Sequence, residues 1–249
     1  MLPTCPIVCN LETKQKEFAM PRIGRVVAPN MPHHIVQRGH NKNAIFVENA
    51  DYSYYLNTLV KWTQLLSVNV YAWCLMTNHV HLLLDPGDNV KSIGLLMKRL
   101  AGRQTRYVNK QEHRTGSLWE GRYKMSIVES DSYFLQCCRY IELNPVKAKM
   151  VAQPEHYRWS SYQENAGLSP PQIIDRTAFK KLNDIGFNHY REFVAKGSSI
   201  SEAIFISQML ESNRLTGKAP FVEEIELRTG IRLEFKRPGR PAKEHKITN

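Results

Sequence analysis

Apolar and polar positions along the chain follow two different periods, which predict strands and helices in turn. Stretches of β-branched, aromatic and aliphatic residues predict strands, and Asp85-Pro86-Gly87 closes the longest stretch with a turn. Stretches with apolar residues three or four positions apart predict helices. Strand-forming segments are expected over residues 33–38, 68–84 and 126–129. Helices are expected over residues 51–66, 90–110 and 131–144, the last stopped by Pro145.

These elements predict an α+β fold in which helices flank an antiparallel sheet. Strands and helices interleave and the long strands are few, which is typical of such a sheet with helices packed on it. The Gly-Leu-Ser-Pro-Pro stretch at 167–171 breaks this pattern. The residues after it are more polar and helical, so a helical C-terminal appendage is expected.

The chain is expected to divide into four parts. Residues 1–19 carry mixed charge without a clear period, and we expect a disordered extension there. Met20 opens a segment that resembles a natural protein start, so 20–166 is expected to form the main domain. Residues 167–235 form the expected helical region, and 236–249 form a basic tail.

Charge changes this picture more than composition does. Hydrophobic residues make up 42% of the 249 residues, which is enough for a sizeable core. Lysine plus arginine number 34 against 23 acidic residues, and the net charge of +11 favours nucleic acid as a partner, with anionic membrane second. No apolar run is long enough to cross a membrane, and the first residues do not resemble a signal peptide. The five cysteines form no CxxC pair, which predicts reduced thiols and a cytoplasmic location.

Two histidines in the second strand-forming segment are spaced to share a ligand. His79 and His81 are separated by one residue, so on a strand both side chains point to one face, with Cα atoms roughly 7 Å apart. Imidazoles at that spacing can converge on one divalent cation. Val80, Leu82 and Leu84 then face the other way, into a core. The alternative is a pair of polar residues on a solvated sheet face.

The third expected helix carries a tyrosine and an asparagine on one face. Tyr140 and Asn144 are four positions apart, whereas Phe134, Cys138 and Ile141 form the opposite, apolar side. A tyrosine hydroxyl can be a nucleophile where charge at the attacked phosphorus is stabilised. The alternative is a surface tyrosine and a capping asparagine. A residue before proline tends to leave the helical conformation, so the orientation of Asn144 stays open.

Together these motifs resemble the HUH motif of single-tyrosine transposases, in which two histidines on a strand act with a tyrosine on a later helix. The resemblance is most specific to the REP-associated tyrosine transposases, a branch of the IS200-like family. It is carried by the segments PHHIVQRG, MTNHVHLLL, GSLWEGRY and YIELNPVKAKMV, and runs from about Met20 to about Gly167.

The resemblance implies a ferredoxin-like HUH catalytic core over residues 20–166. In the family, the two histidines and a side chain one turn after the tyrosine hold Mg2+ or Mn2+. These positions fall on His79, His81 and Asn144, and the family's nucleophile falls on Tyr140. Many insertion-sequence relatives carry glutamine at the third metal position, so Asn144 departs from them and agrees with the REP-associated branch.

The resemblance also implies the reaction and the partners. Tyr140 attacks a phosphodiester of single-stranded DNA, which gives a 5′-phosphotyrosine and a free 3′-OH, and a second 3′-OH can reverse the step and join strands. The family further implies a hairpin-forming DNA partner and a homodimer. The sequence offers no evident base for deprotonating Tyr140, whose ordinary pKa is about 10.

Basic residues outside these motifs are candidates for binding DNA. One stripe on the helix expected at 90–110 recurs at spacings of four, three and four, and the net charge favours phosphate contacts over a merely solvated face. Its members are Arg99, Arg103, Arg106 and Lys110. Trp119, Arg122 and Tyr123 are candidates to stack on unpaired bases, although Trp119 suits the core equally well.

The C-terminal tail has the composition of a DNA-binding arm. Its Pro-Gly-Arg-Pro sequence between basic residues resembles an AT-hook, which lies in the narrow minor groove of AT-rich DNA. The residues expected to contact DNA are Lys236, Arg237, Arg240 and Lys243. A plain disordered basic tail is the alternative.

Two other functions agree with parts of this pattern. The first is a catalytically inactive regulator on the same fold that binds DNA or RNA, and the presence of both histidines, Tyr140 and Asn144 argues against it. The second is an unrelated metal hydrolase of a small phosphoester, and the net charge of +11 argues against that. The sequence therefore predicts a metal-dependent, transposase-type nuclease that cuts and rejoins single-stranded DNA through a tyrosine.

Overall fold

The computed structural model describes residues 25–231 and contains a four-stranded antiparallel sheet. The strand order is β2-β3-β1-β4. The strands are β1 (His33–Arg38), β2 (Asn69–Met76), β3 (His79–Asp85) and β4 (Lys124–Ile127). The extension expected at 1–19 and the basic tail expected at 236–249 lie outside the described residues.

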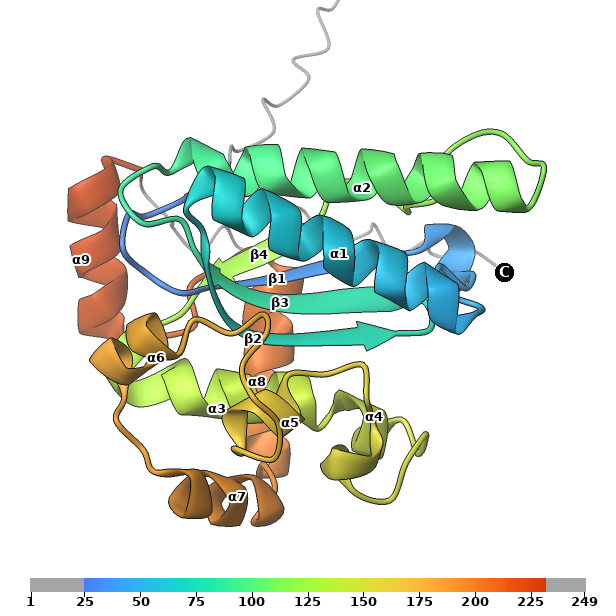
Figure 1. Ribbon diagram of the computed structural model, residues 1–249. Helices are drawn as coiled ribbons and strands as arrows, with labels where there is room; N and C mark the ends of the chain where they lie inside the picture. Colours follow the sequence, from blue (N-terminus) through green and yellow to red (C-terminus); the bar gives the residue numbers. More distant parts are fainter. Residues whose placement is uncertain (1–24, 232–249) are drawn as a thin grey trace, which may run out of the picture.

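Helices cover both faces of the sheet (Figure 1), which confirms the α+β fold with an antiparallel sheet and flanking helices. α1 (Asn49–Leu66) and α2 (Lys91–Gln111) pack together on one face, and α3 (Ser130–Glu142) contacts β2 and β3 on the other. The remaining helices are α4 (Asn144–Lys147), α5 (Tyr162–Asn165), α6 (Arg176–Leu182), α7 (Phe187–Ala195), α8 (Ile200–Glu211) and α9 (Ala219–Thr229), with short 3-10 turns at His40–Lys42 and Pro154–His156. Within residues 25–231, no helix is both long and apolar enough to span a bilayer.

The longest strand-forming segment of the sequence is a hairpin of β2 and β3. Met76 pairs with His79, so Thr77 and Asn78 alone form the turn. The sequence pattern does not reveal this turn, because Thr-Asn lacks the glycine that is typical of two-residue hairpin loops. The hairpin places His79 and His81 at the start of β3.

Both faces of β3 are buried. Val80, Leu82 and Leu84 are fully buried, as their alternation with the histidines predicts. His81 is only 4% exposed on the opposite face, where its ring lies near Tyr140 of α3. The alternative of a solvated sheet face is therefore wrong, because α3 covers that face.

The fourth strand begins two residues earlier than the sequence pattern predicts. β4 covers Lys124–Ile127 because these residues pair with β1, and Glu129 is already the N-cap of α3. The short strand expected at 126–129 therefore exists, and its bounds were wrong.

The third expected helix ends earlier and is followed at once by another. α3 stops at Glu142, and Pro145 lies in the first turn of α4, where its missing N–H is not needed. Asn144 is therefore the first residue of α4 rather than the last of α3. Its spacing from Tyr140 still brings the two residues into contact, since Asn144 Nδ2 donates to the Tyr140 carbonyl oxygen at 2.9 Å.

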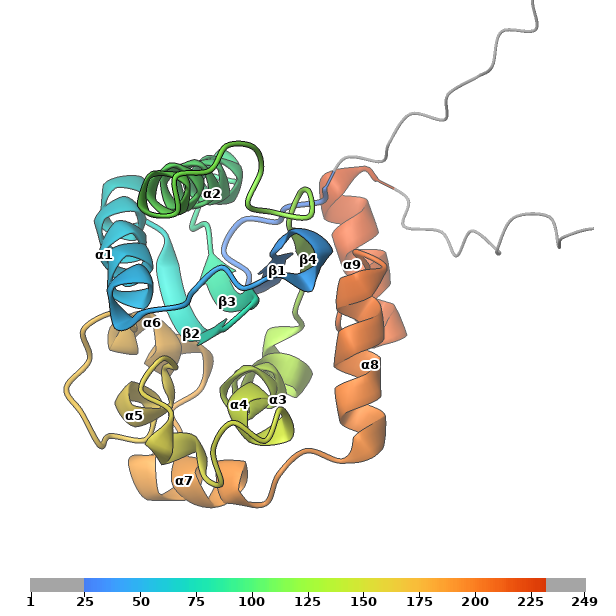
Figure 2. The ribbon, with the colours of Figure 1, turned by 90° about the vertical axis from the view of Figure 1, so that its right-hand side faces the viewer.

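The helix α8 packs beside α3, β4 and β1 (Figure 2). Side-chain contacts hold it near both of its ends. Ser199 caps its N-terminus by accepting a hydrogen bond from the Glu202 N–H. The Glu202 carboxylate forms a 2.7 Å ion pair with Arg139 of α3, and both side chains are largely buried. Just beyond the other end, the Asn213 side chain accepts a hydrogen bond from the Met125 N–H of β4 at 3.0 Å. These contacts fix the helix against the face that carries His81 and Tyr140.

Candidate active site

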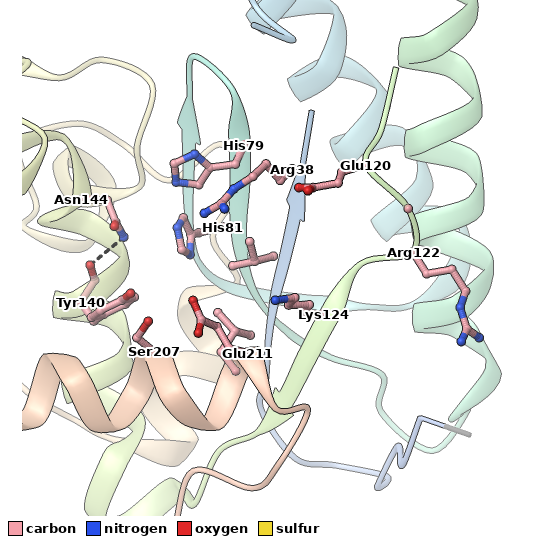
Figure 3. A pocket seen from close by; sticks show the side chains of 13 residues that line it. Arg38, His79, His81, Glu120, Arg122, Lys124, Tyr140, Asn144, Ser207 and Glu211 are labelled. Carbon is pink, nitrogen blue, oxygen red and sulfur yellow. Dashed lines mark hydrogen bonds between the residues drawn. The ribbon is translucent and has the colours of Figure 1, made fainter. Parts of the chain in front are cut away.

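A pocket of about 470 Å³ lies where β1, β3 and β4 meet α3 and α8 (Figure 3). Its wall contains the four residues of the two sequence motifs, which are His79, His81, Tyr140 and Asn144. The histidines come from β3, the tyrosine from α3 and the asparagine from α4. The fold therefore brings the two motifs to one cavity.

Each histidine in the pocket uses one ring nitrogen to bond to the protein. His79 Nδ1 lies 2.6 Å from Asn78 Oδ1, and His81 Nδ1 lies 3.0 Å from His34 Nε2. Burial, with a smaller effect of the Arg38 charge, lowers the pKa of His79 to about 4. Burial has the largest effect on the pKa of His81 and lowers it well below its ordinary value, and nearby histidines and basic groups lower it further. Both rings are therefore neutral at physiological pH, which is the form that binds metal ions.

The amide of Asn144 is oriented by the helix before it. Its Nδ2 donates to the carbonyl oxygens of Tyr140 at 2.9 Å and Ile141 at 3.2 Å. These bonds occupy the nitrogen of the amide and leave Oδ1 for the pocket, which Asn144 lines.

The three side chains fit a divalent cation by the donors that they leave open. The remaining atoms are Nε2 of His79, Nε2 of His81 and Oδ1 of Asn144. Imidazole nitrogen and amide oxygen both suit Mn2+, and oxygen suits Mg2+. Among residues 25–231, no three His, Cys, Asp or Glu side chains are grouped to hold a metal ion. The candidate donor set therefore consists of two imidazole nitrogens and one amide oxygen.

Tyr140 is partly buried between the histidines and α8. Its ring centroid lies 6.0 Å from that of His81 and 5.7 Å from that of His34, and Lys147 Nζ lies 4.4 Å from it. Burial raises the pKa of Tyr140 above its ordinary value, and a hydrogen bond with the Ser207 side chain of α8 acts in the opposite direction. The phenol is therefore protonated at neutral pH and has to lose a proton to act as a nucleophile.

The pocket contains further charged side chains, most of which the sequence motifs do not indicate. Its basic members are Arg38, Arg122 and Lys124, and its acidic members are Glu120 and Glu211. Figure 3 shows Glu211 beside Tyr140 and Ser207, whereas Glu120 lies near Arg38. Of these, the sequence pattern indicated only Arg122, which lies at the outer end of the pocket (Figure 3).

Two of these basic residues, Arg38 and Lys124, are placed at the pocket by strand pairing. Arg38 pairs with His79 across β1 and β3, and Lys124 pairs with Val36 across β1 and β4. The pairing of the strands therefore puts both residues at the end of the sheet where His79 and His81 lie. Ser207 and Glu211 had no comparable signal, because nothing in the sequence places α8 against α3.

The basic stripe predicted on α2 lies away from the pocket. α2 packs on α1, on the sheet face opposite α3. The guanidinium groups of Arg99 and Arg103 lie 4.7 Å and 5.8 Å from the ring centroid of Trp62 on α1. Arg106 and Lys110 are exposed further along α2. These four residues therefore form a surface separate from the histidines and Tyr140.

The aromatic residues predicted to stack on bases are engaged within the protein. Trp119 is buried, and its Nε1 donates to the Ala101 carbonyl oxygen at 3.0 Å, so it belongs to the core. The guanidinium carbon of Arg25 lies 3.9 Å from the ring centroid of Tyr123. The predicted tail contacts Lys236, Arg237, Arg240 and Lys243 lie outside the described residues.

Comparisons with known proteins show which of them this chain is similar to in sequence or in fold. Residues 27–144 match the family described as transposase IS200 like. A curated Haemophilus influenzae protein, described as a REP-associated tyrosine transposase, is 24% identical over 103 residues, which cover 38% of this chain and 58% of that protein. The match thus spans little more than half the length of that relative. A solved structure of a REP-associated tyrosine transposase bound to a REP hairpin superposes with a TM-score of 0.51 at 17% identity, covering 64% of this chain and 96% of that one, so the fold is shared.

Proposed function

We propose that this protein cuts and rejoins single-stranded DNA through Tyr140, because residues 27–144 belong to the IS200-like transposase family. The observation that carries the proposal is that Tyr140, His79, His81 and Asn144 line one pocket. The similar structure contains a REP hairpin, which supports hairpin-forming DNA as the substrate. The net charge of +11 and the basic side chains in the pocket wall suit such a polyanion.

The metal ligands and the phosphate-binding residues have separate roles in this proposal. His79, His81 and Asn144 would hold Mg2+ or Mn2+, and a bound cation would supply polarisation of the scissile phosphate. Arg38 and Lys124 line the same pocket and bind the phosphate oxygens by charge. The remaining chemistry belongs to Tyr140 and to the groups around its hydroxyl.

In the cleavage step, the Tyr140 oxygen forms a bond to phosphorus and the bond from phosphorus to the 3′ oxygen breaks. The products are a 5′-phosphotyrosine and a 3′ oxygen that takes a proton from water. The phosphodiester energy is retained in the covalent intermediate, so a 3′-OH can attack it and release Tyr140 with the strands joined.

We assign the role of proton acceptor for Tyr140 to Glu211. Ser207 lies beside Tyr140 in the pocket wall, and Glu211 lies one turn further along the same face of α8. Figure 3 shows the Glu211 carboxylate directed into the pocket on the side of Tyr140. Contacts with Arg139 and with β4 fix α8 beside the pocket, so the fold sets the position of Glu211, whose side chain is exposed there.

Replacing the carboxylate of Glu211 tests this assignment. We expect Glu211→Gln to lower the rate of covalent adduct formation by about 10²-fold or more at neutral pH, since general base catalysis contributes about 10²–10⁴-fold. Single-turnover kinetics at saturating DNA measure the rate. Glu120→Gln removes the same charge from the same pocket at a position away from Tyr140 and should lower the rate much less. Equal effects of the two variants would show that only the charge of the pocket matters.

The same site predicts a requirement for single-stranded DNA. A tyrosine on a helix has to approach its phosphate in line, with the neighbouring nucleotides splayed across the pocket, and unstacking a duplex costs a few kcal/mol. Labelled hairpins with single-stranded flanks should therefore form a covalent adduct in Mg2+, whereas the fully paired duplex of the same sequence should not. Efficient adduct formation on the blunt duplex would contradict the proposal.

The surface on α2 has a separate proposed role. Arg99, Arg103, Arg106 and Lys110 lie on the face of the sheet opposite the pocket, so they contact DNA outside the cleaved phosphate. The other proposed DNA contacts are Arg122, at the outer end of the pocket, and the tail residues Lys236, Arg237, Arg240 and Lys243. The family also suggests that the protein acts as a homodimer.

A further inference from the structure

His34 contacts both a candidate metal ligand and the candidate nucleophile from within the core. The side chain extends from β1 and is fully buried. Its Nε2 lies 3.0 Å from His81 Nδ1, and the two rings stack with centroids 5.3 Å apart. The same ring and that of Tyr140 form a T-shaped pair with centroids 5.7 Å apart. His34 is therefore a buried residue outside the two motifs that contacts both a candidate metal ligand and Tyr140.

The other nitrogen of His34 distinguishes it from an ordinary core histidine. His34 Nδ1 is buried and has no hydrogen-bond partner. The adjacent His33 is also fully buried, but its Nδ1 bonds to the Met31 carbonyl oxygen at 2.7 Å and its Nε2 accepts from the Ala28 N–H at 3.2 Å. Buried polar atoms without a partner are rare in folded proteins. Packing alone therefore does not account for an imidazole at position 34.

The hydrogen-bond chemistry shows what an imidazole can do there. Asn78 Oδ1 can only accept a hydrogen bond, so its contact with His79 places the proton of His79 on Nδ1 and leaves Nε2 bare. The partner of His81 is a histidine, which can accept or donate. His81 can offer a bare Nε2 to a cation only if its proton lies on Nδ1 and His34 Nε2 accepts it. The proton of neutral His34 then lies on Nδ1, the atom without a partner.

We propose that His34 is a positioning residue, which accepts the Nδ1–H of His81 and thereby directs His81 Nε2 to the cation while its ring supports Tyr140. Such partners of metal ligands set the tautomer and orientation of the ligand, and their loss lowers metal affinity by about 10–100-fold. The inference rests on the proposed metal site and adds a residue to it. It also explains why two histidines from neighbouring strands face each other in a buried layer.

A pair of variants separates the acceptor from the shape of the side chain. His34→Phe keeps a planar ring and removes the acceptor, whereas His34→Gln retains an amide oxygen that reaches the position of Nε2. We expect His34→Phe to weaken Mn2+ binding by about 10–100-fold and His34→Gln to restore most of the affinity. Electron paramagnetic resonance titration of free Mn2+ measures the affinity without DNA, and thermal unfolding shows whether each variant folds. Wild-type affinity in a folded His34→Phe protein would overturn the inference.

The tautomer itself can be measured in the unaltered protein. In wild-type protein labelled with 15N-histidine and saturated with Mg2+, we expect both His34 and His81 to carry their proton on Nδ1 in long-range nitrogen–proton correlation spectra. A proton on Nε2 of His34 in the Mg2+-bound state would overturn the inference, even if His34→Phe failed to fold.

Two controls distinguish failure of this inference from failure of the proposed function. His81→Ala defines the Mn2+ binding that belongs to the site. If the wild type binds Mn2+ no better than His81→Ala, the proposed metal site itself is wrong, and this inference falls with it. If the wild type binds better and His34→Phe matches the wild type, only the role of His34 is wrong.

Discussion

Tyr140→Phe should abolish cleavage and covalent adduct formation, because it removes only the hydroxyl that attacks phosphorus. We expect the single-turnover rate to fall by at least about 10⁴-fold, in line with the loss of a nucleophile in other covalent enzymes. DNA binding should remain, since the ring and its contacts with His34 and His81 are kept. Denaturing gels with 3′-labelled single-stranded hairpin DNA detect the adduct.

The matched control for this variant is Tyr54→Phe. Tyr54 stacks on Tyr107 between α1 and α2, on the other side of the sheet, so its hydroxyl is remote from the pocket. The Tyr54→Phe protein should cleave hairpin DNA at the wild-type rate. A Tyr140→Phe protein that still nicks DNA would show that Tyr140 is not the nucleophile. A wild type that binds hairpins tightly but never forms an adduct would favour the catalytically inactive regulator instead.

Removing either candidate histidine ligand should eliminate metal-dependent cleavage. We expect His79→Ala and His81→Ala each to weaken Mn2+ binding by more than about 100-fold, since loss of a direct ligand exceeds loss of the partner that orients it. Adduct formation in Mn2+ should fall below detection. Isothermal titration of Mn2+ and adduct assays over a range of metal concentrations measure the two effects.

The two variants should differ in stability. His79 lies partly exposed at the start of β3, so its replacement should be tolerated. His81 is buried, and its loss leaves a cavity and removes the partner of His34, so the free energy of unfolding should drop by about 1–3 kcal/mol. His156→Ala, at an exposed position, serves as the control for both. Undiminished cleavage in EDTA by the wild type would contradict the metal assignment.

Local patterns in the sequence were sufficient to predict the main helices and strand-forming segments between residues 33 and 144. Strand β1 and helices α1 and α2 follow from apolar periodicity within a few residues, because each buries one face that repeats along its own length. Alternation along a strand predicts His79 and His81 on one face and Val80 on the other. Helical spacing predicts Asn144 one turn from Tyr140, and the two residues remain in contact across the break between α3 and α4.

The predicted bounds of strands and helices were wrong where the local preference of the chain competes with contacts between distant residues. Thr77 and Asn78 turn the chain without a glycine, because pairing of β2 with β3 stabilises the hairpin. β4 begins at Lys124 because its register with β1 determines which residues pair. Pro145 starts a helix rather than only ending one, since a proline is tolerated in the first turn.

The sequence by itself determined the elements, the positive charge and the four motif residues, because each of these depends on residues close together in the chain. Only the tertiary structure decided which distant side chains complete the pocket. His34 meets His81 because β1 pairs with β3, and Ser207 and Glu211 meet Tyr140 because α8 is fastened across α3 and β4. It also decided that the α2 stripe lies on the opposite face of the sheet from the histidines. Such contacts join residues far apart in sequence and depend on strand order and helix packing, which periodicity within one element does not specify.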